Sequence, residues 1–179
     1  MNKFFAIFFI AIFSLGFAER LSAADDILIV NSQYIVTESK AGTIIRKRTQ
    51  ELTDELRDMV SDLEKYVKDE TEKYQQERTL LSPEMQKQRE VDINAEVKKR
   101  QDALQLKRQR VEEAIQRAYA EIDPTYNAIL ISVMNDKGAK MILDTRTVLQ
   151  SDPSLNVSAQ VIKQLNKRLP EVTVNVVED

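Results

Sequence analysis

Apolar residues between positions 44 and 136 recur at the intervals of three and four that are typical of a coiled-coil helix. In the first half of this stretch several of them are seven residues apart, with leucines between them. This seam consists of Ile45, Leu52, Leu56, Met59, Leu63 and Tyr66. The second half carries a comparable series from Val91 to Val133. The polar positions are mostly Glu, Lys, Arg and Gln, which favour helix, so the pattern predicts two long helices.

A turn is predicted at Ser82-Pro83, between the two helices. Ser is a good helix N-cap, Pro is favoured at the first helical position, and Glu84 suits the first turn. If the chain folds back there, the facing apolar pairs are Tyr74 with Val91, Val67 with Val97, Met59 with Leu106, and Leu52 with Ile115. We therefore expect residues 44–136 to form an antiparallel helical hairpin with its turn at 82–83. Pro124 should bend or break the return helix near Asp123.

The segments on either side of the hairpin carry short apolar runs that are typical of strands. They are Ile27–Val30, 140–144, 147–149 and the alternating segment 171–176. A short amphipathic helix is predicted over 157–169. The fold class is therefore α+β, with the hairpin inserted in a small sheet body made of residues 25–43 and 137–179. A body of roughly 60 residues is marginal for burying a core alone, so oligomerisation is expected to supply apolar surface.

Residues 1–24 have the three-part layout of a secretory signal. Met1-Asn2-Lys3 is a short cationic start, the apolar run from Phe4 to Phe17 follows, and Ser22-Ala23-Ala24 supplies small residues for cleavage. We expect cleavage after Ala24, with Ala18 and Ala23 as other sites. A membrane anchor is the alternative, but a span needs roughly 20 apolar residues, and Glu19-Arg20 interrupts this run early.

The composition restricts the chemistry that the chain can perform. The sequence has no His and no Cys, which excludes imidazole bases, thiol nucleophiles, disulfides and zinc sites of the usual ligand type. It contains no phosphate-binding glycine loop and no nucleophile elbow. We therefore expect no enzyme activity, no cofactor, no nucleotide and no metal. The expected mature chain has a net charge of −4, which argues against nucleic acid as a partner.

The two arms of the predicted hairpin differ in charge and become less apolar toward the turn. Residues 51–77 carry a net charge of −6 and residues 84–110 a net charge of +3, so facing charges should help to set the register, although each exposed pair contributes only about 0–1 kcal/mol. Thin packing near the turn should leave apolar residues free to contact another molecule. The candidates are Tyr66, Tyr74, Leu80, Leu81 and Met85; helix packing is the alternative role for the tyrosines.

The mature sequence resembles the Skp/OmpH family of periplasmic chaperones over essentially its whole length. The resemblance lies in the opening strand 27–33, in the charged hairpin, and above all in the segment from Met141 through Asp152-Pro153-Ser154-Leu155 to Asn166. It implies a homotrimer with a central β-barrel body and three hairpins projecting as tentacles. It also implies ATP-independent holding of unfolded outer-membrane β-barrel proteins in the periplasm. The expected core of the trimer body is Ile27, Leu28, Ile29, Val30, Ile142, Leu143 and Val148.

Two features depart from that family. Its best-known members are strongly basic, whereas this sequence has a pI of about 5.3, which argues against binding to lipopolysaccharide or a membrane surface; the basic stretch 98–110 is the one local substitute. The segment 171–176 extends past the usual end and has no assigned role. The competing interpretation of the sequence is a structural coiled-coil rod or docking adaptor of the cell envelope.

Overall fold

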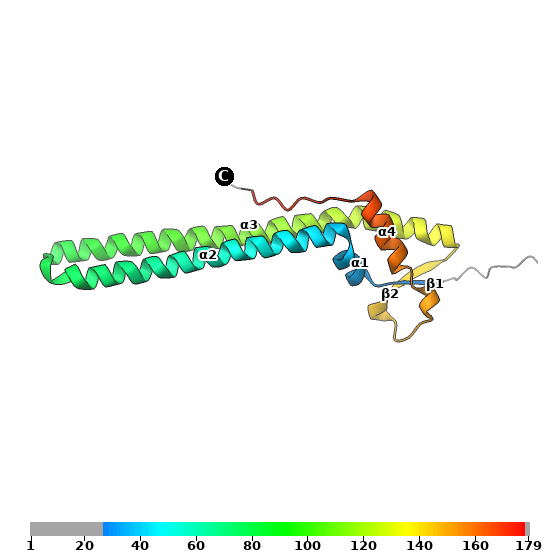
Figure 1. Ribbon diagram of the computed structural model, residues 1–179, viewed down its shortest axis with the longest axis horizontal. Coiled ribbons are helices and arrows are strands. Elements are labelled where there is room, and N and C mark those ends of the chain that lie inside the picture. The colour runs from blue at the N-terminus through cyan, green and yellow to red at the C-terminus, as the bar shows by residue number, and fades with distance from the viewer. Residues whose placement is uncertain (1–26, 178–179) are drawn as a thin grey trace, which may run out of the picture.

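The computed structural model describes residues 27–177, and it consists of one long helical hairpin with a small body at its open end (Figure 1). The predicted signal at residues 1–24 lies outside the described residues. In chain order the helices and strands are β1 (Ile27–Val30), α1 (Ser32–Glu38), α2 (Lys40–Glu77), α3 (Pro83–Lys137), β2 (Met141–Asp144) and α4 (Ser158–Arg168). Short 3-10 turns, labelled η1 (Arg78–Leu80), η2 (Thr145–Thr147) and η3 (Pro153–Leu155), connect some of them.

The hairpin consists of α2 and α3, and its turn forms as the sequence predicts. Ser82 is the N-cap of α3 and its hydroxyl accepts a hydrogen bond from the Met85 N–H at 3.3 Å. Pro83 follows at the start of the helix, where its missing N–H costs nothing. At the other end Gly138 closes α3 with φ 66°, a left-handed conformation that suits glycine. At 1.5 Å per residue, α2 alone is about 57 Å long.

The side-chain contacts between the arms fall close to the predicted register. The Tyr74 hydroxyl donates a hydrogen bond to Glu90, at 2.6 Å, whereas Val91 was the predicted partner. Val91 and Val67 are both exposed, so the apolar pairs predicted for them do not bury their side chains. Contacts between the arms near the turn are therefore largely polar.

The hydrophobic core lies at the open end of the hairpin and not along its length. Here α2 and α3 pack against α4, α1 and β1. The fully buried side chains of this core include Leu28, Ile35, Ile45, Leu52, Ile122, Ile129, Val161 and Leu165. Between Leu52 and Leu104, a stretch described in full, Tyr74 is the one buried hydrophobic residue. The prediction that packing thins toward the turn is confirmed.

The sheet has two parallel strands in the described part of the chain. β1 pairs with β2 in a register that places Ile27 beside Met141 and Val30 beside Asp144. Parallel neighbours require a long crossover connection, and the whole hairpin serves as that connection. An isolated bridge joins Ile29 to Asn156 on the other side of β1, where the Val157 N–H donates to the Ile29 carbonyl at 2.9 Å.

The strand predicted at Ile27–Val30 is confirmed, and the strand predicted at 147–149 is wrong. The opening strand ends at Val30 and does not extend through the family-like segment to residue 33, because the Asn31 side chain accepts from the Tyr34 N–H at 2.8 Å and caps α1. The segment 147–149 was expected to be a strand. Instead the chain turns at η2, where the Thr147 hydroxyl donates to the Asp144 carbonyl at 2.8 Å.

Pro124 was predicted to bend or break the return helix; the break does not occur, since α3 continues through it to Lys137. Proline removes one backbone hydrogen bond, but Ile122 and Ile129 on either side of it are buried in the core. Their packing holds the backbone helical across the lost bond. No break therefore separates the hairpin from the body.

The alternating segment 171–176 is extended but does not join the sheet, contrary to the prediction. It runs from the end of α4 back along the hairpin toward the turn (Figure 1). Its valines pack on the helices, so an apolar alternation that is typical of a strand is satisfied here by a helical surface. We refer to residues 169–177 as the tail.

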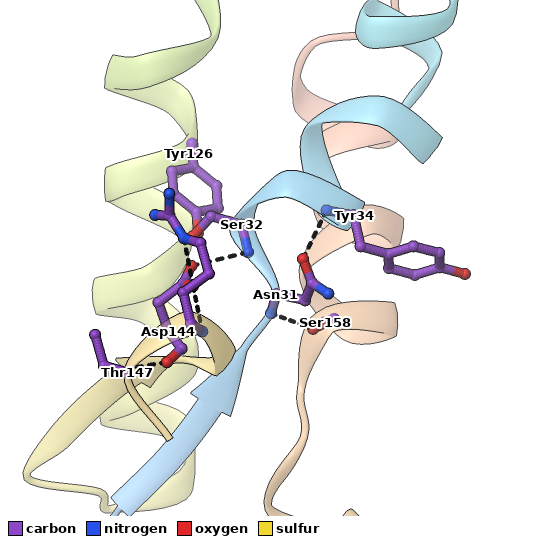
Figure 2. A network of polar contacts seen from close by, with 8 residues as sticks. Asn31, Ser32, Tyr34, Tyr126, Asp144, Thr147 and Ser158 are labelled. Atoms are coloured by element: carbon purple, nitrogen blue, oxygen red, sulfur yellow. Dashed lines mark hydrogen bonds and ion pairs between the residues drawn. The ribbon is translucent and has the colours of Figure 1, made fainter. Parts of the chain in front are cut away.

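A polar network centred on Asp144 of β2 ties β2 to the start of α1 and to α3 (Figure 2). The Asp144 carboxylate accepts hydrogen bonds from the Ser32 N–H at 3.1 Å and from the backbone and side chain of Arg146 at 2.9 and 2.8 Å. The Ser32 hydroxyl lies 2.8 Å from the Tyr126 hydroxyl on α3. Hydrogen bonding from Ser32, followed by the Arg146 N–H, holds the pKa of Asp144 well below its usual range.

This lowered pKa predicts a pH-dependent contribution to stability. An unfolded Asp titrates near about 3.9, so the Asp144 carboxylate stabilises the fold above that pH and the stabilisation is lost as pH falls below it. We expect Asp144→Asn to lower the free energy of unfolding by about 1–3 kcal/mol at neutral pH. The loss should shrink progressively as pH falls below about 3.9, because the unfolded carboxyl takes up its proton before the folded one does. Urea unfolding at several pH values measures it, with the exposed Asp58→Asn as control; a loss independent of pH would contradict the role assigned to the carboxylate.

Candidate functional site

Two apolar surfaces of the described chain are left uncovered, one at the hairpin turn and one on the body. Among residues 27–177 no three carboxylates are grouped closely enough to hold a metal ion. None of the helices described is long and apolar enough to cross a membrane. The candidate site consists of these exposed apolar surfaces, which have the chemistry to contact another polypeptide.

The surface at the turn consists of Leu80 and Met85, with Leu81 half-buried between them. Leu80 is 85% exposed and Met85 57% exposed. The Gln86 side chain fixes this loop, because its amide donates to the carbonyls of Arg78 and Leu81 at 2.9 and 3.1 Å. These bonds satisfy backbone groups inside the loop and leave the Leu80 side chain in solvent. We refer to these three residues as the tip surface.

The two tyrosines predicted to join the tip surface lie between the arms instead. Tyr74 is only 9% exposed, and its hydrogen bond to Glu90 raises the pKa of its hydroxyl. Tyr66 is half-buried under the Arg100 guanidinium, which lies 4.3 Å from the ring centroid, a cation–π distance. Both rings thus hold the arms together, and Tyr74 is not available to a bound molecule in this conformation.

Charged contacts between the arms supplement these rings. Arg89 reaches Glu70 on the facing helix at 2.5 Å, and Lys73 pairs with the same carboxylate at 2.8 Å. The Lys73 hydrogen bond, with help from Arg89, lowers the pKa of Glu70. Farther from the turn, Lys107 lies 3.4 Å from Glu55. Several other ion pairs join residues three or four apart on one helix, where they do not affect the register.

The surface on the body lies beside the sheet. Ile27 and Met141, neighbours in the sheet, are both exposed, and Leu149 is fully exposed. Within residues 27–177 no strand pairs with the second edge of β2. Of the predicted body core, the chain itself buries Leu28, Ile29 and Val30. Ile142, Leu143 and Val148 remain half-buried.

The sequence interpretation missed part of the exposed apolar surface. Val91 and Val67 were assigned to the seam but are exposed, and Leu106, assigned to face Met59, borders an open cleft between the arms. Their heptad spacing suggested burial. The signal that could have revealed them is the low density of apolar residues near the turn, because a seam with few partners cannot cover every member.

We expect Tyr74 to be the main stabilising residue of the outer hairpin. Tyr74→Ala should lower the free energy of local opening near the turn by about 1–3 kcal/mol, because it removes a buried ring and its hydrogen bond. Leu80→Ala, at an exposed site, should change it by less than about 0.5 kcal/mol. Hydrogen exchange of peptides within 66–97 measures both changes. Equal exchange in the two variants would show that Tyr74 does not hold the arms.

Comparison with known proteins places the fold. The family model described as "Outer membrane protein (OmpH-like)" matches residues 26–165. A crystal structure from Caulobacter crescentus CB15, of a candidate outer membrane chaperone described as OmpH-like, superposes with a TM-score of 0.79 at 18% sequence identity. That match covers 86% of this chain and 91% of the other. No curated protein matches the sequence.

Because the sequence identity is low, the structural match establishes a shared architecture and nothing further. The family model spans β1, the hairpin, β2 and most of α4, and it ends before the tail. The chain therefore belongs to the OmpH-like outer membrane protein family.

Proposed function

We propose that this protein is an ATP-independent holdase of the periplasm, which binds unfolded outer-membrane β-barrel proteins and prevents their aggregation before assembly. The observation that carries the proposal is a long hairpin whose outer half has almost no core and exposes Leu80 and Met85 at its end. Family membership supports it, as does the likeness to a candidate outer membrane chaperone. The signal proposed at residues 1–24 would direct the chain to that compartment.

Weak and numerous contacts suit the holding of an unfolded chain. Burying one large apolar side chain contributes about 1.5–3 kcal/mol at most, so the tip surface can engage an exposed apolar strand without trapping it. An outer hairpin held by polar contacts such as Glu70–Arg89 can also open locally at low cost. The arms can thus adapt to clients of different size, and no nucleotide is needed for release.

The surface on the body is proposed to be the trimer interface. Ile27, Met141 and Leu149 are apolar and exposed in the single chain, and β2 has an unpaired edge in the described part. An exposed strand edge favours pairing with another chain. Strands from three copies would extend the two-stranded sheet into a barrel, cover these side chains and hold three hairpins around a shared cavity.

The interface is tested at Leu149, which contacts little within its own chain. We expect the wild-type protein, residues 25–179, to sediment with three times the mass of one chain. Leu149→Asp should shift the population to monomer without loss of helix, because it places a charge in an apolar interface. Leu80→Asp makes the same change at the far end of the molecule and should leave the mass unchanged. A trimer in both variants would reject this interface.

Holdase activity is tested by light scattering of an outer-membrane β-barrel protein diluted from urea, without nucleotide. The wild-type protein should suppress scattering near one trimer per client. Leu80→Ser with Met85→Ser should weaken client affinity about three- to thirtyfold, because two apolar contacts are lost. The control is Thr71→Ser with Thr79→Ser, two exposed polar sites near the same turn. A folded oligomer that suppresses no aggregation would favour the structural rod.

A further inference from the structure

The tail lies on the hairpin with a strict alternation of buried and exposed side chains. Val172 and Val174 are each 7% exposed and belong to the core cluster, and Val176 packs against it. Thr173 and Asn175, between them, are exposed. Successive side chains of an extended chain point to opposite sides, so one side of the tail faces the hairpin and the other faces solvent.

Both arms contribute to the surface under the tail. Ile44, Lys47, Arg48 and Glu51 of α2 line the groove beside residues 172–175. From α3, Arg117 donates a hydrogen bond to the Asn175 carbonyl at 3.3 Å. The Arg117 hydrogen bond goes to a backbone carbonyl, which every residue has, and the valines contribute only apolar packing. The contacts therefore suit a segment with apolar side chains at every second position, and they do not require one particular sequence.

The groove continues beyond the described end of the tail. Next to Val176 an open cleft of ≈ 510 Å³ follows the seam between the arms toward the turn. Its apolar lining includes Met59, Ala103 and Leu106, and Leu106 is 45% exposed. Lys107 and Arg110 of α3 also line it, and Lys107 is paired there with Glu55. The described tail thus fills only the part of this surface nearest the body.

We propose that this groove is a binding site for an extended segment of unfolded polypeptide with alternating apolar side chains, and that residues 171–176 are its built-in competitor. The proposal rests on the proposed holdase function for the identity of the segment. Transmembrane β-strands alternate apolar and polar residues in the same way, and the tail sequence Glu-Val-Thr-Val-Asn-Val copies that pattern. The segment that occupies the groove thereby indicates the chemistry of the ligand.

Covalent attachment makes the tail an effective competitor. A tethered segment faces its own site at an effective concentration in the millimolar range, so weak segments in solution are excluded. A longer client strand can also use the cleft at Met59 and Leu106, which the described tail leaves open. A long client strand with alternating apolar residues would therefore displace the tail. Shorter segments, and segments without this alternation, would not. This competition sets a threshold for binding.

The test compares two full-length tail variants. The released variant replaces the three valines that pack on the hairpin: Val172→Ser, Val174→Ser and Val176→Ser. The control variant replaces exposed residues of the same segment: Thr173→Ser, Asn175→Ser and Val177→Ser. Far-UV circular dichroism and thermal melting check that the helices remain intact in both.

The probes are fluorescein-labelled peptides whose binding is read by anisotropy. One has the sequence of residues 171–179, one is a strand peptide with alternating Val and Thr, and one has the strand composition with its valines grouped together. We expect the released variant to bind both alternating peptides about tenfold or more tightly than the wild type, because a groove that is free only part of the time weakens apparent affinity by that fraction. The control variant should match the wild type. Adding Leu106→Ser to the released variant should reduce the gain.

Each result decides the proposal. Equal peptide affinity in wild type and released variant would overturn competition by the tail. Binding of the tail peptide but not the alternating strand peptide, or equal binding of the grouped peptide, would make the tail a structural brace and overturn the site. Peptide binding does not depend on chaperone activity, so its presence in a protein that fails to suppress aggregation would reject the holdase function and leave the groove standing.

Discussion

The packing of α4, α1 and β1 on one end of the hairpin holds the molecule together. Two helices of this length cannot stay paired through exposed charges, because such pairs contribute little. Buried side chains such as Leu52, Ile122 and Leu165 supply the necessary apolar contact, and all of them lie near the body. The Asp144 network adds a polar tie between the two segments of the chain that the hairpin separates. The outer part of the hairpin, toward the turn, packs against no other element of the described chain and is anchored only through this core.

This one-sided support creates the surfaces that the proposed function requires. Toward the turn the arms are joined by contacts such as Tyr74 with Glu90 and Arg89 with Glu70, and few apolar groups are covered. A region of this kind opens at low cost and leaves residues such as Leu80 uncovered. Near the body the same two helices form a well-packed surface, on which the tail lies. The same hairpin therefore has an end near the turn that can open locally and, near the body, a well-packed groove in which the tail lies.

Local signals in the sequence were sufficient for much of the fold. The heptad spacing gave the hairpin, and Ser82-Pro83-Glu84 marked its turn, because capping depends on a few adjacent residues. The strand at Ile27–Val30 was also predictable from its apolar run. The errors have two different origins. Pro124 stays helical because distant contacts bury its neighbours. The segment 147–149 turns because of a local signal that was missed, since Asp144 accepts hydrogen bonds from the Arg146 N–H and the Thr147 hydroxyl.

The candidate site shows the same division. Composition and periodicity alone determined a long, charged, cysteine-free hairpin with weak packing at its turn, because these properties depend on which residues are present and how they are spaced. Only the tertiary structure decided that Tyr74 is covered while Leu80 is not, and that the alternating tail lies on helices instead of joining the sheet. An apolar alternation specifies one face to be buried, but it does not specify the surface that buries it. That choice depends on which surfaces the rest of the chain brings within reach.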